Sequence, residues 1–76
     1  IKSNIKINKT ISLKLANDIK KIEVDYIAKY KNFRILIRKS GTEPLYRVLV
    51  EGNSVKNCLI ISSKITNRIK KSIDAG

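Results

Sequence analysis

The chain is short, strongly basic and poor in aromatic residues. Its 76 residues include 17 lysines and arginines against 6 carboxylates, which gives a formal net charge of +11, and it contains no histidine. This length allows one small domain with a modest core. The lack of histidine removes the commonest general base at neutral pH and the commonest metal ligand. The carboxylates form no tight metal-loop spacing, so we expect no metal site within the chain.

The cysteine content and the apolar runs bear on the cellular setting. Cys58 is alone, which excludes an internal disulfide and favours a reducing, cytoplasmic environment. No apolar run approaches the ~20 residues needed to span a bilayer, and no signal-peptide pattern opens the chain, so we expect no membrane partner. The first residue is Ile1 instead of methionine, which indicates a fragment of a longer protein.

The positive charge raises the alternative of a small nucleic-acid-binding module, because clustered lysines and arginines neutralise backbone phosphates. Ile, Lys and Asn together supply 34 of the 76 residues, a composition in which lysine is the default surface residue. The lysines are scattered over every segment, and aromatic platforms for base stacking are missing. These features argue against nucleic acid as the partner.

The predicted elements begin with a strand over residues 3–9, where isoleucines alternate with polar residues. The alternation continues through Ile11, Leu13 and Leu15, so the pattern leaves the end of this strand open. The spacing becomes helical over about residues 16–30. The apolar stripe of this predicted helix contains Ile19, Ile22, Glu23, Tyr26, Ile27 and Tyr30. Residues 33–38 and 46–51 predict two further strands, and the seven-residue connection between them favours an antiparallel hairpin.

A second helix is predicted over residues 55–73, with Asn53 or Ser54 as its N-cap. Its apolar face is expected to contain Val55, Cys58, Leu59, Ser62, Ile65, Thr66, Ile69 and Ile73. Two amphipathic helices bury their stripes most economically on one face of a small sheet. The predicted fold is therefore a two-layer α+β domain (β-α-β-β-α) with a mainly antiparallel sheet. The other sheet face is expected to be polar, or covered by a neighbour in the full protein.

The connection inside the predicted hairpin is the most informative segment. Arg38 and Arg47 flank the sequence Ser40-Gly41-Thr42. Arginine offers planar, permanently charged donors, hydroxyl groups offer neutral donors, and a glycine lets backbone amides turn toward an anion. Arg38 ends one strand and Arg47 begins the next, so we expect the two guanidinium groups to converge on one phosphate at the loop.

The neighbours of this segment are expected to be structural. Pro44 is interpreted as a rigid turn element and Glu43 as a support for the loop, because a carboxylate aimed at a phosphate would repel it. Tyr46 is expected to pack as ordinary sheet surface, and Glu51 to pair with Arg47 across the sheet. No catalytic acid, base or nucleophile is predicted within the chain.

Residues 38–44 (Arg-Lys-Ser-Gly-Thr-Glu-Pro), followed by residues 47–52 (Arg-Val-Leu-Val-Glu-Gly), resemble the phosphate-binding loop of the C-terminal domain of α-D-phosphohexomutases. Among these, they are most similar to the bacterial phosphoglucosamine mutases, whose typical pattern is Arg-x-Ser-Gly-Thr-Glu-Pro-x-x-Arg-Val-Met-Val-Glu. Leu49 replaces the methionine with a side chain of similar volume. The phosphate ligands of the family correspond to Arg38, Ser40, Thr42 and Arg47, with Gly41 contributing its backbone.

The resemblance implies that residues 1–76 form a single C-terminal domain of a larger enzyme and are inactive alone. Three further domains would carry the phosphorylated serine, the aspartate loop that binds magnesium and the sugar-recognition loop. The full enzyme would interconvert glucosamine 6-phosphate and glucosamine 1-phosphate through a 1,6-bisphosphate, in peptidoglycan precursor synthesis. The alternative is a phosphohexomutase that acts on glucose or mannose phosphates, because the sugar-recognition loop is not in this sequence.

Overall fold

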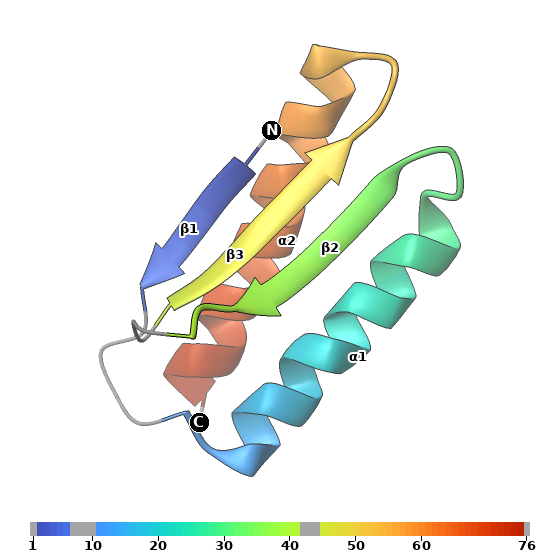
Figure 1. Ribbon diagram of the computed structural model, residues 1–76. Coiled ribbons are helices and arrows are strands. Elements are labelled where there is room, and N and C mark those ends of the chain that lie inside the picture. Colours follow the sequence, from blue (N-terminus) through green and yellow to red (C-terminus); the bar gives the residue numbers. More distant parts are fainter. Residues whose placement is uncertain (1, 7–10, 42–44, 76) are drawn as a thin grey trace.

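The structure, a computed structural model, describes residues 2–6, 11–41 and 45–75. In chain order, the elements are β1 (Lys2–Lys6), α1 (Leu13–Lys29), β2 (Arg34–Lys39), β3 (Leu45–Glu51) and α2 (Val55–Ala75). The strand order in the sheet is β1-β3-β2, and β3 runs antiparallel to both neighbours. Both helices lie on the same side of this sheet (Figure 1). The predicted two-layer α+β fold and its antiparallel hairpin are confirmed.

The core lies between the sheet and the two helices. The central strand β3 contributes Val48 and Val50, and α2 contributes Ile65 and Ile69; all four side chains are fully buried. Burying an aliphatic side chain of this size favours folding by about 1.5 to 3 kcal/mol. The remaining buried apolar residues of this cluster are Ile5, Leu15, Ile19, Ile22, Ile35, Ile37, Tyr46, Cys58 and Ile61. Because β3 is both central and buried, it fixes the position of the hairpin.

α1 begins at Leu13, earlier than the sequence pattern predicts. The side-chain oxygen of Ser12 accepts a hydrogen bond from the Leu15 amide at 3.1 Å, which caps the helix. The cap overrides the alternating pattern that favours an extended chain through Leu15. β1 ends at Lys6, and the rest of the predicted first strand, residues 7–9, lies outside the described residues. The buried residues of α1 are Leu15, Ile19, Ile22 and Glu23, whereas Ile27, predicted on this face, is 45% exposed.

α2 begins after the predicted N-cap Ser54, whose side-chain oxygen accepts a hydrogen bond from the Asn57 amide at 3.3 Å. The buried face of α2 consists of Cys58, Ile61, Ser62, Ile65 and Ile69. The prediction for Val55 and Leu59 is wrong, because both are exposed, and Ile61 takes their place. Among the described residues, neither helix is long and apolar enough to cross a membrane.

The hairpin end remote from its loop, the far end, is packed tightly. A Cβ atom placed on Gly52 would lie 2.2 Å from Cδ2 of Phe33. Glycine, which has no Cβ atom, therefore fits beside this ring where a larger residue would clash. The Phe33 ring also meets Tyr30 edge to face at a centroid distance of 6.3 Å. The far end is therefore defined by close packing of aromatic rings.

Candidate phosphate-binding site

At the loop end of the hairpin, Arg38 of β2 is the direct cross-strand partner of Arg47 of β3. The Ser40 amide donates a hydrogen bond to the Leu45 carbonyl at 2.9 Å, which closes the hairpin beyond the last paired strand residue. Ser40 itself is buried. The fold thus brings three of the predicted site residues to one end of the sheet.

The remaining predicted site residues are Gly41 and Thr42. Gly41 is exposed, its φ is not positive, and a Cβ atom at this position would meet no described atom within 4 Å. Neither the local backbone nor the described packing therefore demands a glycine here. Thr42 lies outside the described residues, as do Glu43 and Pro44, for which a support role and a turn role are predicted.

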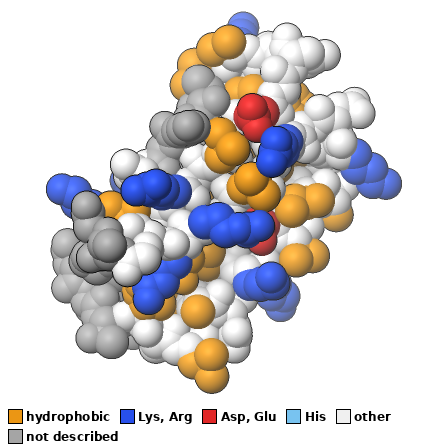
Figure 2. Space-filling model, viewed as in Figure 1, with side chains coloured by type: hydrophobic (Ala, Val, Ile, Leu, Met, Phe, Trp, Pro, Cys, Tyr) orange, Lys and Arg blue, Asp and Glu red, His pale blue; other side chains and the backbone are white. Residues whose placement is uncertain are grey.

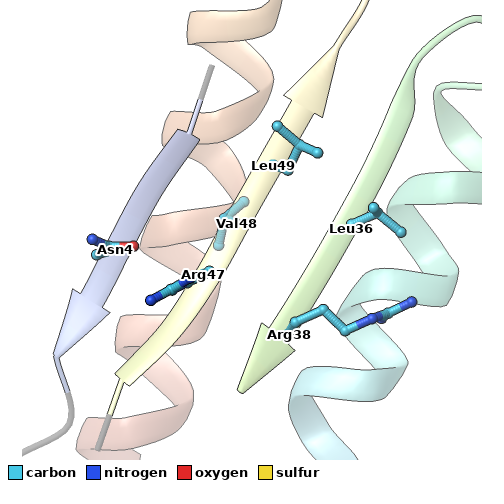
Figure 3. A pocket seen from close by; sticks show the side chains of 6 residues that line it. All are labelled: Asn4, Leu36, Arg38, Arg47, Val48 and Leu49. Atoms are coloured by element: carbon cyan, nitrogen blue, oxygen red, sulfur yellow. The ribbon is translucent and has the colours of Figure 1, made fainter. Parts of the chain in front are cut away.

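Both arginines belong to the sheet face that no helix covers, the open face. Strand alternation directs Val48 and Val50 toward the helices, so Arg47 and Leu49, which alternate with them, face outward. β1 adds Asn4, the cross-strand partner of Arg47 on its other side. A shallow hollow of about 390 Å³ lies on the open face (Figure 3). Its lining residues are Asn4, Leu36, Arg38, Arg47, Val48 and Leu49.

The open face mixes charge with apolar surface. Figure 2 shows more Lys and Arg side chains than Asp and Glu side chains on this face, with apolar patches between them. Leu36 and Leu49 are half-buried cross-strand partners at its centre. The rim of the open face is polar as predicted, but its centre is not. The alternative, that a neighbour in the full protein covers this face, stays a prediction.

The guanidinium group of Arg38 bends over the edge of β2 toward α1 (Figure 3). Its Nη1 atom donates a hydrogen bond to Oε2 of Glu23 at 3.0 Å and another to the Ile37 carbonyl at 3.1 Å. The Glu23 side chain is only 10% exposed, whereas that of Arg38 is 64% exposed. The ion pair therefore joins a buried carboxylate on α1 to a cation that remains accessible to solvent.

The side chain of Arg47 points the other way, toward Asn4 and β1 (Figure 3). Among the described residues, no carboxylate lies within ion-pairing distance of its guanidinium group. The two guanidinium groups therefore diverge in this structure, and their convergence on one phosphate stays a prediction. Two like charges directly opposite each other on a sheet repel, and Glu23 draws Arg38 to the outer edge of β2.

Two neighbouring residues also differ from prediction. Glu51 pairs with Arg34, its cross-strand partner, at 3.6 Å, instead of with Arg47. Tyr46 is only 6% exposed and belongs to the core instead of the sheet surface, because strand alternation directs it toward the helices. Burial raises the pKa of the Tyr46 phenol above its ordinary value of 10.0.

The same geometry is accompanied by a sequence match over most of the chain. Residues 4–58 match the family described as phosphoglucomutase/phosphomannomutase, C-terminal domain. The chain belongs to this family. The matched range covers the hairpin, its loop and α1, and therefore every described residue at the loop end. The resemblance to phosphohexomutases is confirmed.

Two relatives of this phosphohexomutase domain carry the same name. The chain is 48% identical over 75 residues to a phosphoglucosamine mutase of Prochlorococcus marinus (strain AS9601), which covers 97% of this chain and 16% of that protein. It is 49% identical over 41 residues to a phosphoglucosamine mutase of Thermosipho africanus (strain TCF52B), which covers 54% of this chain and 10% of that protein. The chain thus spans a small part of the length of these relatives.

The sequence-based prediction of the phosphate site omits two residues of this phosphohexomutase domain, Glu23 and Asn4. Glu23 carries a signal that the pattern contained, since a carboxylate within an apolar helical stripe needs a charged or hydrogen-bonding partner. Asn4 carries no such signal. It reaches the hollow only because β1 pairs with β3 in the register that places Asn4 opposite Arg47.

The donors gathered at the loop end suit an anion and not a cation. Among the described residues, no group of three His, Cys, Asp or Glu side chains could hold a metal ion. The residues present in this part of the chain therefore do not fit a magnesium ion, which the resemblance assigns to another domain.

Proposed function

We propose that this domain binds the phosphate group of a hexose phosphate that is not being transferred, within a multidomain phosphohexomutase. The observation that carries the proposal is the cross-strand pairing of Arg38 with Arg47 at the loop end. Like charges directly opposite each other destabilise a hairpin. A bound phosphate dianion offsets this repulsion, because it attracts both guanidinium groups at once.

The proposed phosphate ligands are Arg38, Ser40, Gly41, Thr42 and Arg47. The arginines supply charge-assisted hydrogen bonds, and the hydroxyl groups supply neutral donors. No atom of the described residues would meet a Cβ at Gly41, so the backbone there can approach an anion, which a side chain at this position would obstruct. On phosphate binding, Arg47 would turn from β1 toward Arg38 and the loop.

The catalytic contribution proposed for this domain is anchoring. Holding the remote phosphate places the other end of the sugar against a phosphoserine on another domain, and such positioning lowers the barrier by pre-ordering the reactants. A cradle of arginines and backbone amides recognises phosphate without contacting the sugar. The same loop can therefore hold either phosphate of a 1,6-bisphosphate after it has turned around.

The proposed reaction of the full enzyme is the interconversion of glucosamine 6-phosphate and glucosamine 1-phosphate, because the relatives described above are phosphoglucosamine mutases. Magnesium, the phosphoserine and sugar recognition are assigned to domains outside residues 1–76, which we propose form a single C-terminal domain that is inactive alone. A cytoplasmic location is proposed because Cys58 is a free thiol. The alternative substrates are glucose and mannose phosphates, which the family description favours. Comparing kcat/KM for the three sugar phosphates decides between them.

A phosphate titration of the 76-residue chain, followed by amide chemical shifts, tests the proposed binding site. The expected result is saturable shifts at Ser40, Gly41 and Thr42. Shifts spread evenly over the surface lysines would indicate nonspecific attraction of anions and would overturn the proposal. Sodium chloride at the same ionic strength is the control for charge screening.

A further inference from the structure

Among the described residues, Glu23 is the buried charged group that the proposed function does not use. It lies on α1 within the stripe that contains Ile19 and Ile22, and its side chain is 10% exposed. Its Oε2 atom accepts hydrogen bonds from the Ile37 amide at 2.8 Å and from Nη1 of Arg38 at 3.0 Å. A carboxylate buried this far is costly unless it is paired and hydrogen-bonded, so both contacts are needed for its stability.

The backbone of β2 fixes the position of this carboxylate. β2 is an edge strand, and the amide of Ile37 points away from β3 to the side that no strand covers. Glu23 satisfies this amide by reaching from α1 to the strand edge. The carboxylate is therefore held by a rigid backbone donor, independently of the flexible side chain of Arg38.

Glu23 contacts only the Nη1 atom of the Arg38 guanidinium group. The Nη1 atom has two hydrogens, and its two acceptors are Oε2 of Glu23 and the carbonyl oxygen of Ile37. Among the described residues, Nε and Nη2 have no acceptor. These two atoms form a fork of parallel donors, which is the geometry that binds two phosphate oxygens together.

We propose that Glu23 is a positioning residue for phosphate binding: it holds Arg38 through Nη1 and thereby presents the Nε–Nη2 fork to the substrate phosphate. This inference rests on the proposed function of the loop. A long arginine side chain loses considerable rotamer freedom when it binds a ligand. The contact with Glu23 restricts that freedom before the substrate arrives, so less is lost on binding.

Positioning and simple electrostatics predict opposite effects of removing the charge of Glu23. If the carboxylate acted only as a negative charge near the site, its neutralisation would strengthen phosphate binding. If it positions Arg38, its neutralisation weakens binding and misplaces the reacting end of the sugar. The direction of the change in KM therefore distinguishes the two roles.

The test uses the full-length enzyme with Glu23→Gln, because glutamine keeps the size of the side chain and an oxygen that accepts the Ile37 amide. We expect KM for the sugar phosphate to rise and kcat/KM to fall about 10-fold. The matched control is Glu51→Gln, which removes the same charge from the exposed Arg34–Glu51 pair of the same hairpin. We expect its kinetic constants to equal those of the wild type.

A double-mutant cycle with Arg38→Ala separates positioning from a general loss of structure. We expect Glu23→Gln to have no further effect on kcat/KM when Arg38 is already alanine. Equal losses in both backgrounds would overturn the inference, as would a lower KM in Glu23→Gln. Normal kinetics in Arg38→Ala would overturn the proposed function itself, whereas an impaired Arg38→Ala beside a normal Glu23→Gln would overturn only the role of Glu23.

Arg38→Lys provides a test that does not depend on the folding of a Glu23 variant. Lysine keeps the positive charge and can still pair with Glu23, but it offers no fork of two parallel donors. We expect its KM to rise in the same direction as that of Arg38→Ala. A wild-type KM in Arg38→Lys would show that no oriented fork is needed, and the inference would fail.

Discussion

The register of the β2–β3 hairpin places opposite charges across from each other at one end and like charges at the other. At the far end, Arg34 lies opposite Glu51, and the two side chains form an exposed ion pair at 3.6 Å. At the loop end, Arg38 lies opposite Arg47, and the two side chains point in opposite directions (Figure 3). Opposite charges across a sheet stabilise it, and like charges destabilise it.

The difference shows where folding and ligand binding make conflicting demands. At the far end, the charges of Arg34 and Glu51 compensate each other and the Phe33 ring is closely packed, so charge and packing both favour the folded hairpin. The loop end places two cations at opposite positions of adjacent strands, and a third residue, Glu23 of α1, holds one of them. Local conflicts of this kind are expected at functional sites, where a ligand supplies the missing interaction.

Replacing either arginine of the loop end is expected to have the largest effect. In the full-length enzyme, Arg38→Ala or Arg47→Ala should raise KM and lower kcat, with a loss of about 2 to 4 kcal/mol in kcat/KM, because a charge-paired phosphate contact is removed. Steady-state kinetics provides the measurement. Arg34→Ala at the far end is the matched control and should leave both constants unchanged. Wild-type constants in both loop-end variants would contradict the assignment.

The two glycines of the hairpin should respond oppositely to alanine. Gly52→Ala forces a methyl group against the Phe33 ring and should lower the free energy of unfolding by about 1 to 3 kcal/mol. Gly41→Ala meets no atom of the described residues and should change this free energy by less than about 0.5 kcal/mol, yet weaken phosphate binding. Denaturant unfolding and phosphate titration of both variants check this pattern. Equal destabilisation by the two substitutions would contradict it.

Removing a charge should have opposite effects on stability at the two ends. Arg47→Leu relieves the repulsion from Arg38 and should stabilise the domain by about 0.2 to 1 kcal/mol. Glu51→Gln breaks an exposed ion pair and should destabilise it by at most about 1 kcal/mol. Denaturant midpoints at low salt measure both changes, and high salt should reduce each of them. Changes of the same sign would remove the proposed contrast.

The smallest effect concerns pH and Tyr46. Burial raises the pKa of this phenol above 10.0, so its contribution to stability is fully present below the unfolded-state pKa. The contribution is lost as pH rises through the folded-state pKa, because the folded state disfavours the phenolate. Tyr46→Phe should therefore lose less stability than the wild type above a pH of about 10. Identical alkaline unfolding of the two proteins would contradict this expectation.

Much of the fold follows from local pattern. The β-branched runs on either side of the loop predict the hairpin, and Ser54 is recognisable as an N-cap. The cap at Ser12 is harder to predict, since the alternation through Leu15 competes with it. The expectation of a surface position for Tyr46 is wrong, because Tyr46 shares its strand face with Val48 and Val50, and alternation places all three in the core.

The candidate site is less predictable than the fold. The pair Arg38 and Arg47 follows from hairpin register, which a short loop nearly determines. The contact of Arg38 with Glu23 depends on how α1 docks beside β2, a tertiary relation that periodicity does not contain. The divergent orientation of the arginines follows from that contact and from their mutual repulsion. Sequence thus predicts which residues lie opposite each other in the hairpin, but not which way their side chains turn.

The strand order β1-β3-β2 has a kinetic consequence. The hairpin joins two strands that are close in sequence, whereas β1 must pair with β3 across the whole of α1 and β2. Closing the longer loop costs more chain entropy, so we expect β1 to dock after the hairpin has formed. Substitutions in the hairpin should then slow folding, while substitutions in β1 mainly speed unfolding. Arg38 and Arg47 would accordingly reach their cross-strand positions before the sheet is complete, and Asn4 would reach its position beside Arg47 when β1 docks.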